Sequence, residues 1–496
     1  MRVARQTHAH HRTPGRPLYT AGMKRITAAI GLAAVACAAA NTPGQSPQPE
    51  RQAEQASRDA REPRAYEIAL EHNARVMAMP EEDKAWPVYR RVWGSLLESG
   101  YSEDLLFKNN EWAPTSPRAR RFVVQHADLL DRVVEASSRP ALSRPHAWPD
   151  GTRLSRRTLH DESGTRRLLA QLDDSHIQVF YGLGDLLSAR ALIAISAGEY
   201  AEALDVYLAS GRIARHLSGG PLGDQWVGAG MRQARQTVAS RLISNGDETL
   251  LDAMRNDLKQ DVGVRFMLEH ERAVINDIIE CSYEQHGTGP MTFGGFRYLF
   301  DVLSFDRARR WVFFEALFSD EISASPAFGP LAEAARAELN ERMRLAAGSE
   351  VAALADKLFR IIDKIHNARP WETAEALAAF EALRMRLSEY LDDPAANNFG
   401  ALGFKLKDPN PYAERRQVIW TLESVTRAML AVQSFRNRHG RLPDSLDEID
   451  DDLLAGPMTS GTTGQPLRFT LEEDRPTLVL DGSDGDRSFD ISPYID

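Results

Sequence analysis

The sequence predicts a mainly α-helical chain, in which an irregular helical array is followed by a small α+β module at the C-terminus. Apolar residues recur with helical spacing in nearly every segment from Arg64 to about Leu391. The period-two alternation of a half-buried strand is scarce there and becomes clear only near the C-terminus. Residues 392–411, rich in Asn, Pro and Gly, separate the two patterns. We therefore expect a helical domain over 63–395, a linker over 396–411 and an α+β module over 412–496.

The composition is that of a globular, acidic protein. The 496 residues are 43% hydrophobic, which suffices for a large core. A mean hydropathy of −0.39 argues against a polytopic membrane protein. The net charge of −10 argues against a general nucleic-acid binder, which needs a concentrated basic face.

The N-terminal region has the layout of an exported protein. Residues 1–22 precede a second methionine, Met23, and are interpreted as an upstream extension. A signal peptide is predicted over 23–40, because two basic residues are followed by an apolar run too short to span a bilayer. Residues 41–62 are rich in Pro, Gln, Ser and charge, which predicts a disordered tether.

The end of the apolar run offers two cleavage sites. Ala34-Val35-Ala36-Cys37 resembles a bacterial lipobox, and the resemblance implies that Cys37 is lipidated and anchors the protein to a membrane. The alternative is an ordinary Ala-x-Ala site at Ala38-Ala39-Ala40, which would release a soluble periplasmic protein. Either cleavage leaves Cys281 as the only thiol, which we expect to be buried and inert.

Leu186 to Leu217 is predicted to form an antiparallel helix pair at the centre of the helical domain. Its turn is Gly198-Glu199-Tyr200, where glycine supplies the positive φ that ends a helix with little strain. Small residues at 191, 194, 203 and 210 would let the two axes approach closely. The order Gly-Glu-Tyr, then Ala203 and Tyr207, resembles the tetratricopeptide helix pair. Trp226 to Ile243 is expected to add a third stacked helix.

We find no catalytic motif in the sequence. His270-Glu271 lacks the second histidine of a zinc-protease helix, and no nucleophile elbow, phosphate loop or paired-cysteine zinc site occurs. Gly182-Leu183-Gly184 and Gly228-Ala229-Gly230 follow no predicted strand, which argues against dinucleotide binding. Structural roles in or near the central array are expected for His160, His176 and His216, and core positions for Trp86, Tyr89, Trp93 and Tyr101.

The C-terminal module begins with a helix predicted over Tyr412 to His439. Its apolar stripe would be Val418, Leu422, Val425, Met429 and Val432, and Gly440 would end it. The runs PLRFTL and TLVLDG alternate on either side of residues 474–476, which predicts a β-hairpin.

This module resembles the globular part of the major pseudopilins of type II secretion. The resemblance rests on AVQSFRNRHGRLPDSLDEI, then GQPLRF, then a terminal DGSDGD. It implies a long helix, a small sheet and a C-terminal calcium loop, in which Asp481, Asp484 and Asp486 would bind the ion. The family's methylation signal and membrane-spanning half-helix are absent before Tyr412. The whole layout is similar to a family of exported bacterial proteins with a tetratricopeptide-like helical body.

Three functions are compatible with these features. The leading hypothesis is a non-catalytic envelope protein, tethered by its N-terminal lipid, whose helical body binds another, unidentified envelope protein. No cofactor is expected apart from calcium, and no nucleic-acid partner. The alternatives are an envelope hydrolase whose site is assembled only in three dimensions and an accessory of a pilus-like secretion system.

Overall fold

The computed structural model describes residues 64–108, 111–159, 167, 169, 172–218, 220–260, 272–274, 277, 360, 364, 368–374, 377–378, 410–472, 475–480 and 487–491. Of these residues 68% are helical, which confirms the prediction of a mainly α chain. The longer helices are α3 (Arg64–Ala78), α4 (Trp86–Glu98), α5 (Pro117–Gln125), α6 (Ala127–Ser137), α7 (His176–Ala197), α8 (Tyr200–Leu217), α9 (Leu222–Ile243), α10 (Glu248–Gln260) and α19 (Asn410–His439). Short 3-10 turns are η1 (Glu81–Asp83), η2 (Glu103–Leu106), η3 (Arg156–Thr158), η5 (Pro370–Glu372), η6 (Leu446–Glu448) and η7 (Asp451–Leu453).

The predicted helix pair is formed by α7 and α8. Gly198 has φ of 80° and ends α7 in the left-handed conformation. The amide of Gly198 donates to the carbonyl of Ile195 (3.0 Å) and that of Glu199 to the carbonyl of Ala194 (2.9 Å), the two bonds of a Schellman cap. The small residues predicted at the contact are buried, whereas Ala197 is exposed because it is the last helical residue.

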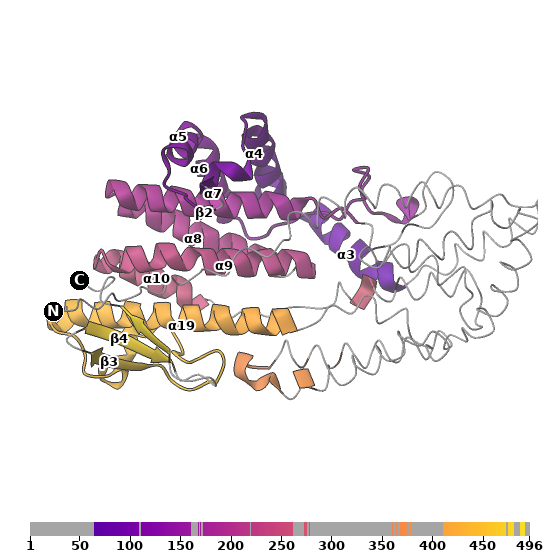
Figure 1. Cartoon of the computed structure of the whole chain (residues 1–496). Coiled ribbons are helices and arrows are strands. Elements are labelled where there is room, and N and C mark those ends of the chain that lie inside the picture. Colours follow the sequence, from indigo (N-terminus) through magenta and orange to yellow (C-terminus); the bar gives the residue numbers. More distant parts are fainter. Residues whose placement is uncertain are drawn as a thin grey trace, which may run out of the picture.

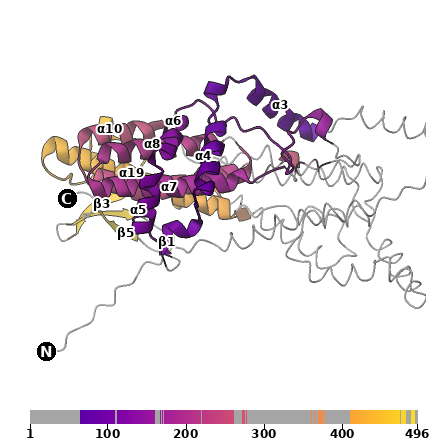
Figure 2. The ribbon, with the colours of Figure 1, turned by 90° about the horizontal axis from the view of Figure 1, so that it is seen from above.

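Helices α7, α8 and α9 pack against one another and α19 packs on α9 to complete a stack, with α4, α5 and α6 on the side of α7 and α8 (Figures 1 and 2). Helix α9 extends the predicted third helix to Leu222 and runs antiparallel to α8. Their axes approach closely at Gly228, where a Cβ would lie 2.9 Å from the carbonyl oxygen of Ala214. Helix α19 runs parallel to α9, since Arg232 pairs with Glu423 and Gly246 with Asn437.

One hydrophobic core extends through this stack and into the C-terminal elements. It includes Leu186 on α7, Ile213 on α8, Leu242 on α9, Leu430 on α19 and Leu478 in the sheet. The four aromatic residues predicted in the core lie there as expected, with Tyr89 and Tyr101 buried and Trp86 and Trp93 packed against them.

Helix α7 is central to that core. Among the described residues it is the one helix whose length and hydropathy pass the test for a membrane span, and 72% of that window is buried inside the structure. Burial of this kind is typical of a core helix. Its two glycines, Gly182 and Gly184, are buried within the helix, as Gly228 and Gly230 lie within α9, so neither pair forms a loop.

The C-terminal strands form an antiparallel sheet in the order β3 (Arg468–Glu472), β4 (Arg475–Leu480) and β5 (Arg487–Asp490). Strands β3 and β4 form the predicted hairpin, with Phe469 opposite Leu478. The turn was predicted too late in the chain, because Arg475 and Pro476 belong to β4 and pair with Glu472 and Leu471. The third strand was not predicted. A separate two-stranded ribbon joins β1 (Phe107–Lys108) to β2 (Glu111–Trp112).

The apolar stripe predicted on α19 is wrong in its first half. Val418 is 46% exposed, while the carboxylate-bearing Glu423 is fully buried at 0%. Met429 and Val432 are buried as predicted. The reason is that α19 packs on α9 and α10 on one side and on η5 and the C-terminal loops on the other. Polar side chains that find partners on these two sides are buried, so α19 has no single apolar face.

Several sequence predictions lie outside the described residues. These are the upstream extension, signal peptide, Cys37 and tether over residues 1–62, Cys281, His160, His270-Glu271, and the acidic loop of Asp481, Asp484 and Asp486. Most of the region 261–409 also lies outside them.

Candidate functional site

The most unusual polar contact in the described chain joins His176 to Asp224. His176 is the first residue of α7, and Asp224 lies in the first turn of α9. Because α8 returns the chain between them, the two parallel helices begin at the same end of the stack. The imidazole Nε2 hydrogen-bonds to Oδ1 of Asp224, and the two side chains are only 3% and 2% exposed.

Local chain geometry places the carboxylate. Pro221 starts α9 from an extended backbone, φ −52° and ψ 159°, so Asp224 falls at a helix N-terminus, where the helix dipole favours a negative charge. A Cβ at Gly220 would lie 2.5 Å from Oδ2 of Asp224, so the loop before α9 can fold over the carboxylate only because residue 220 is glycine.

Aromatic rings and an arginine surround the pair. The His176 ring meets Trp86, the first residue of α4, edge-on at 6.2 Å between centroids. Phe180, one turn further along α7, lies 6.4 Å from the same ring. The buried Arg144 guanidinium also faces this cluster: burial lowers the pKa of Arg144, and the charges of Asp224 and Asp173 oppose that shift.

This arrangement resembles a general base held by a carboxylate, with one difference. Asp224 occupies Nε2, and the buried Nδ1 of His176 has no hydrogen-bond partner among the described residues. An imidazole in that position can accept a proton at Nδ1 while the carboxylate stabilises the resulting charge. It can equally fix the two helix ends against each other, since a buried carboxylate is costly without a partner.

A second polar region lies between α9, α10 and α19, and we call it the polar seam. Glu423 of α19 lies 3.2 Å from Arg232 of α9 and 3.6 Å from Arg427 one turn along its own helix. A second carboxylate, Asp257 of α10, binds Arg235 at 2.9 Å and Arg215 of α8 at 3.0 Å. Of these pairs, Arg232–Glu423 joins α19 to α9, whereas the pairs of Asp257 join α10 to α8 and α9.

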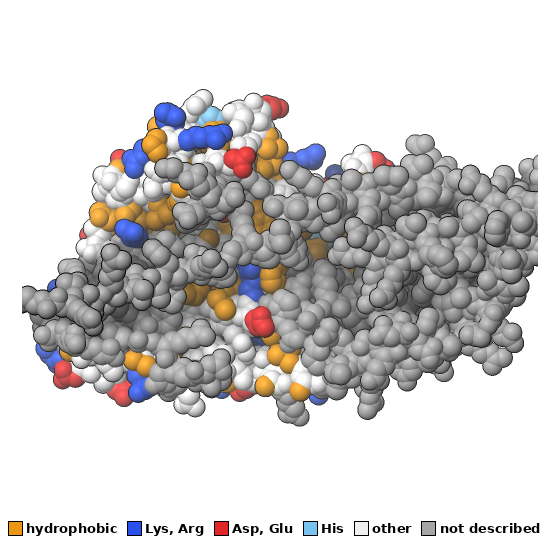
Figure 3. All heavy atoms as spheres, viewed as in Figure 1, with side chains coloured by type: hydrophobic (Ala, Val, Ile, Leu, Met, Phe, Trp, Pro, Cys, Tyr) orange, Lys and Arg blue, Asp and Glu red, His pale blue; other side chains and the backbone are white. Residues whose placement is uncertain are grey.

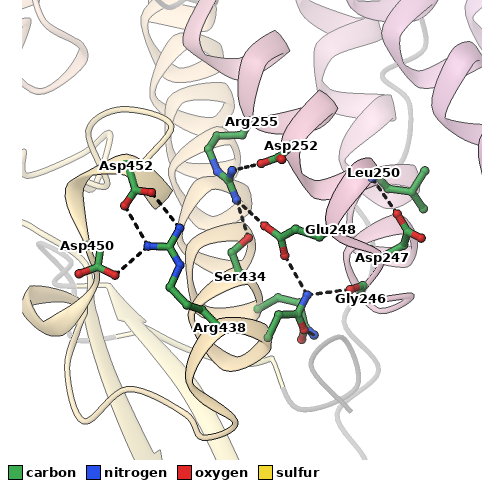
Figure 4. A network of polar contacts seen from close by, with 12 residues as sticks. Gly246, Asp247, Glu248, Leu250, Asp252, Arg255, Ser434, Arg438, Asp450 and Asp452 are labelled. Atoms are coloured by element: carbon green, nitrogen blue, oxygen red, sulfur yellow. Dashed lines mark hydrogen bonds and ion pairs between the residues drawn. The ribbon is translucent and has the colours of Figure 1, made fainter.

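The polar seam continues to the end of α19, as Figure 4 shows. Arg255 of α10 donates to Ser434 at 2.6 Å and also reaches Glu248 and Asp252. Beyond it, Arg438 forms an exposed fork with Asp450 and Asp452. The hydrogen bonds that Arg438 donates to those carboxylates raise the pKa of Arg438 above its usual range. The ion pairs along α19 are therefore buried near Glu423 and exposed to solvent near Arg438.

The histidines singled out in the sequence are hydrogen-bonded where the structure describes them. Nε2 of His216 donates to the carbonyl oxygen of Arg139 at 2.8 Å, and burial lowers the pKa of His216. His176 is bound to Asp224. Both therefore have the structural partners that we expected, although the partner of His176 is itself ionisable.

Sequence reasoning missed Asp224, Arg144 and both ends of the Arg232–Glu423 pair. An acidic residue just after Pro221 is a signal for a helix start, which Asp224 provides, but nothing local indicates its burial against His176. Among the described residues, no group of three or more His, Cys, Asp or Glu is placed to hold a metal ion.

Comparison of the chain with protein-family models, with curated proteins and with solved structures found no match.

Proposed function

We propose that the protein is a helical scaffold of the bacterial envelope, tethered through a lipid on Cys37, that binds another envelope protein without catalysing a reaction. Within this proposal the stack of α7, α8 and α9 is a tetratricopeptide-like array, and α19 with β3, β4 and β5 is an α+β module of pseudopilin type. The observation that supports it best is the continuity of the core from α7 to the sheet. A body of this kind presents its surface side chains in a fixed arrangement.

The polar seam favours the same role. Buried ion pairs add little net stability compared with apolar contacts, because both charges lose their hydration. They can specify how two helices align, and here the buried Arg232–Glu423 pair sets α19 against α9, together with a hydrogen bond that the Asn437 side chain donates to the carbonyl of Gly246. We infer that a fixed geometry between α19 and the body is the property that these charges provide.

Exposed apolar side chains on α4 and α5 supply a surface for the partner. Leu97 is 50% exposed and Val124 is 64% exposed. Hydrophobic side chains gather over the α4–α7 region on the face in Figure 3, between scattered charged ones. Apolar atoms in the centre of such a patch and charges around it are the usual composition of a protein interface.

Photo-crosslinking in intact bacterial cells tests the scaffold. A photoreactive phenylalanine at Leu97 or Val124 should crosslink one and the same envelope protein, whereas Val418, exposed to a similar degree on α19, serves as the matched control. Failure of both α4–α5 positions to capture a protein that the control does not capture would refute the proposed surface.

The tether requires a separate experiment. Mass analysis of the mature N-terminus should find diacylglyceryl-cysteine at Cys37, and Cys37→Ser should move the protein from the membrane to the soluble fraction. A mature chain beginning at Asn41 would contradict lipidation while leaving the scaffold intact.

The His176–Asp224 pair favours a second candidate, an envelope hydrolase. The supporting observation is the buried imidazole whose Nε2 is held by a carboxylate and whose Nδ1 has no partner among the described residues. A screen of the purified chain with ester, amide and glycoside substrates would detect it. His176→Gln should abolish any activity found and His216→Gln, at a half-buried histidine, should retain it; equal rates in both variants would exclude this pair as the site.

A further inference from the structure

Helix α3 is attached to the protein outside the main core. Two of its buried residues, Tyr66 and Ala69, belong to a small hydrophobic cluster that is separate from the main core. The other buried members of that cluster are Trp148, Leu154, Leu159, Leu169 and Ala273. Trp148 and Leu154 belong to the irregular segment 142–154, which we call the latch segment. Much of the apolar contact of α3 is therefore with the latch segment and with residues near it.

Polar contacts join α3 to the latch segment. The Asn73 side chain accepts from the amide of His146 at 2.7 Å, and donates to the carbonyls of His146 (3.0 Å) and Leu154 (2.8 Å). His72 Nε2 donates to the carbonyl of Arg144 at 2.8 Å, which requires the proton on Nε2 because a carbonyl can only accept. Two adjacent residues of one helix thus hold the backbone of a loop.

The latch segment is strained where α3 holds it. Ser143 has φ of 56°, a left-handed conformation that is unfavourable for a non-glycine residue. Its hydroxyl donates to the sulfur of Met79, just beyond the end of α3, at 2.7 Å. Such backbone strain persists only when neighbouring contacts enforce it. Release of α3 would therefore also let Ser143 leave the left-handed conformation.

The surroundings of His72 disfavour a second proton on its ring. Burial lowers the pKa of His72 most strongly, the hydrogen bond to the Arg144 carbonyl opposes this, and the charges of Arg144 and of Arg75 on α3 lower the pKa further. Asp224 on α9 raises it slightly, but that carboxylate is bound to His176. The His146 ring lies against His72 at 4.6 Å between centroids. A protonated His72 would therefore have two arginines and a second imidazole as neighbours.

We propose that α3 and the latch segment form an acid-sensitive latch, in which proton uptake by His72 releases α3 from the rest of the protein. The sign follows from linkage. In the released state His72 titrates near its ordinary value of about 6.5, whereas in the docked state it binds a proton only at lower pH. Docking of α3 is therefore complete at a pH above the ordinary pKa of histidine. It is lost as the pH falls from that value towards the lowered pKa of docked His72. Since α3 directly follows residues 41–62, release would lengthen the predicted tether.

Hydrogen exchange of the full chain at pH 7.5 and pH 5.0, with labelling times scaled for the intrinsic exchange rate, tests the latch. Amides of α3 should open more at pH 5.0, by up to about tenfold per pH unit for a single proton. Amides of α8, in the main core, should keep their protection. Equal protection of α3 at both pH values would overturn the proposal.

Three variants identify the group. His72→Gln keeps a donor near the Arg144 carbonyl but cannot titrate, so the acid-dependent opening of α3 should disappear. His439→Gln, the matched control at a histidine 40% exposed on α19, should behave like the parent. Asn73→Ala should open α3 at both pH values. Opening that persists in His72→Gln, or an Asn73→Ala variant as protected as the parent, would refute this assignment.

Discussion

Removing the charge of Glu423 should destabilise the protein more than any exposed charge change. Glu423 is completely buried, 3.2 Å from Arg232 and 3.6 Å from Arg427, whose side chains are 6% and 2% exposed. Glu423→Gln preserves the volume and removes the carboxylate charge from between two buried guanidinium groups. Breaking a buried pair in this way costs about 3–5 kcal/mol. If the free energy of unfolding falls by about 2–3 kcal/mol per molar urea, the midpoint of unfolding should shift to a urea concentration about 1–2 M lower.

Urea titration followed by tryptophan fluorescence measures this shift. Asp452→Asn is the matched control, because it removes a carboxylate that pairs with the exposed Arg438 on the same helix, and its midpoint should stay at that of the parent. Replacing Arg232, Glu423 and Arg427 together by Met, Leu and Met should recover the midpoint, since no buried charge of this group then remains. A Glu423→Gln midpoint equal to the parent's would refute the assignment of buried charge to this seam.

Three further predictions concern single positions. Gly198→Ala should lower the free energy of unfolding by about 1–2 kcal/mol, because residue 198 needs a left-handed backbone, whereas Gly94→Ala, inside α4 with open space around it, should raise it by about 0.5–1 kcal/mol in the same denaturation assay. Gly461→Ala should displace the 459–464 loop from α19, since a Cβ would lie 2.2 Å from the carbonyl oxygen of Gln417; exchange of the loop amides should rise, and unchanged exchange would contradict the contact. His216→Gln should weaken the loss of stability on acidification below about pH 6.5, because the pKa of His216 is lowered in the folded state; a pH profile identical to the parent's would show that the histidine does not contribute.

The sequence identified those elements whose signals are local. Gly198 marked the end of α7, and the turn it makes is the one that a glycine followed by a helix start predicts. Alternating residues on both sides of a predicted turn identified β3 and β4, although β4 already begins at Arg475, inside the residues predicted for the turn. These features depend on neighbours a few residues apart, so one segment of sequence contains all the information needed.

The candidate site depends on distant pairs and could not be found in this way. His176 and Asp224 are 48 residues apart, and Arg232 and Glu423 are 191 apart. Each of these residues is an ordinary polar residue on its own helix, because its burial depends on which helix packs against it. The error on α19 has the same origin: helical spacing favoured Val418 as a core residue, but two-sided packing with polar partners buried Glu423 instead.

The shared core of α9 and α19 has a consequence for the order in which the protein can fold. Arg232 emerges from the ribosome long before Glu423, its partner 191 positions later. Until α19 arrives, the guanidinium of Arg232 and the apolar side chains beside it must remain hydrated or be covered by another molecule. Native packing of α9 and α10 against α19 is therefore a late event that needs nearly the whole chain. A fragment ending before residue 410 should consequently be a substrate for chaperones and proteases rather than a stable domain.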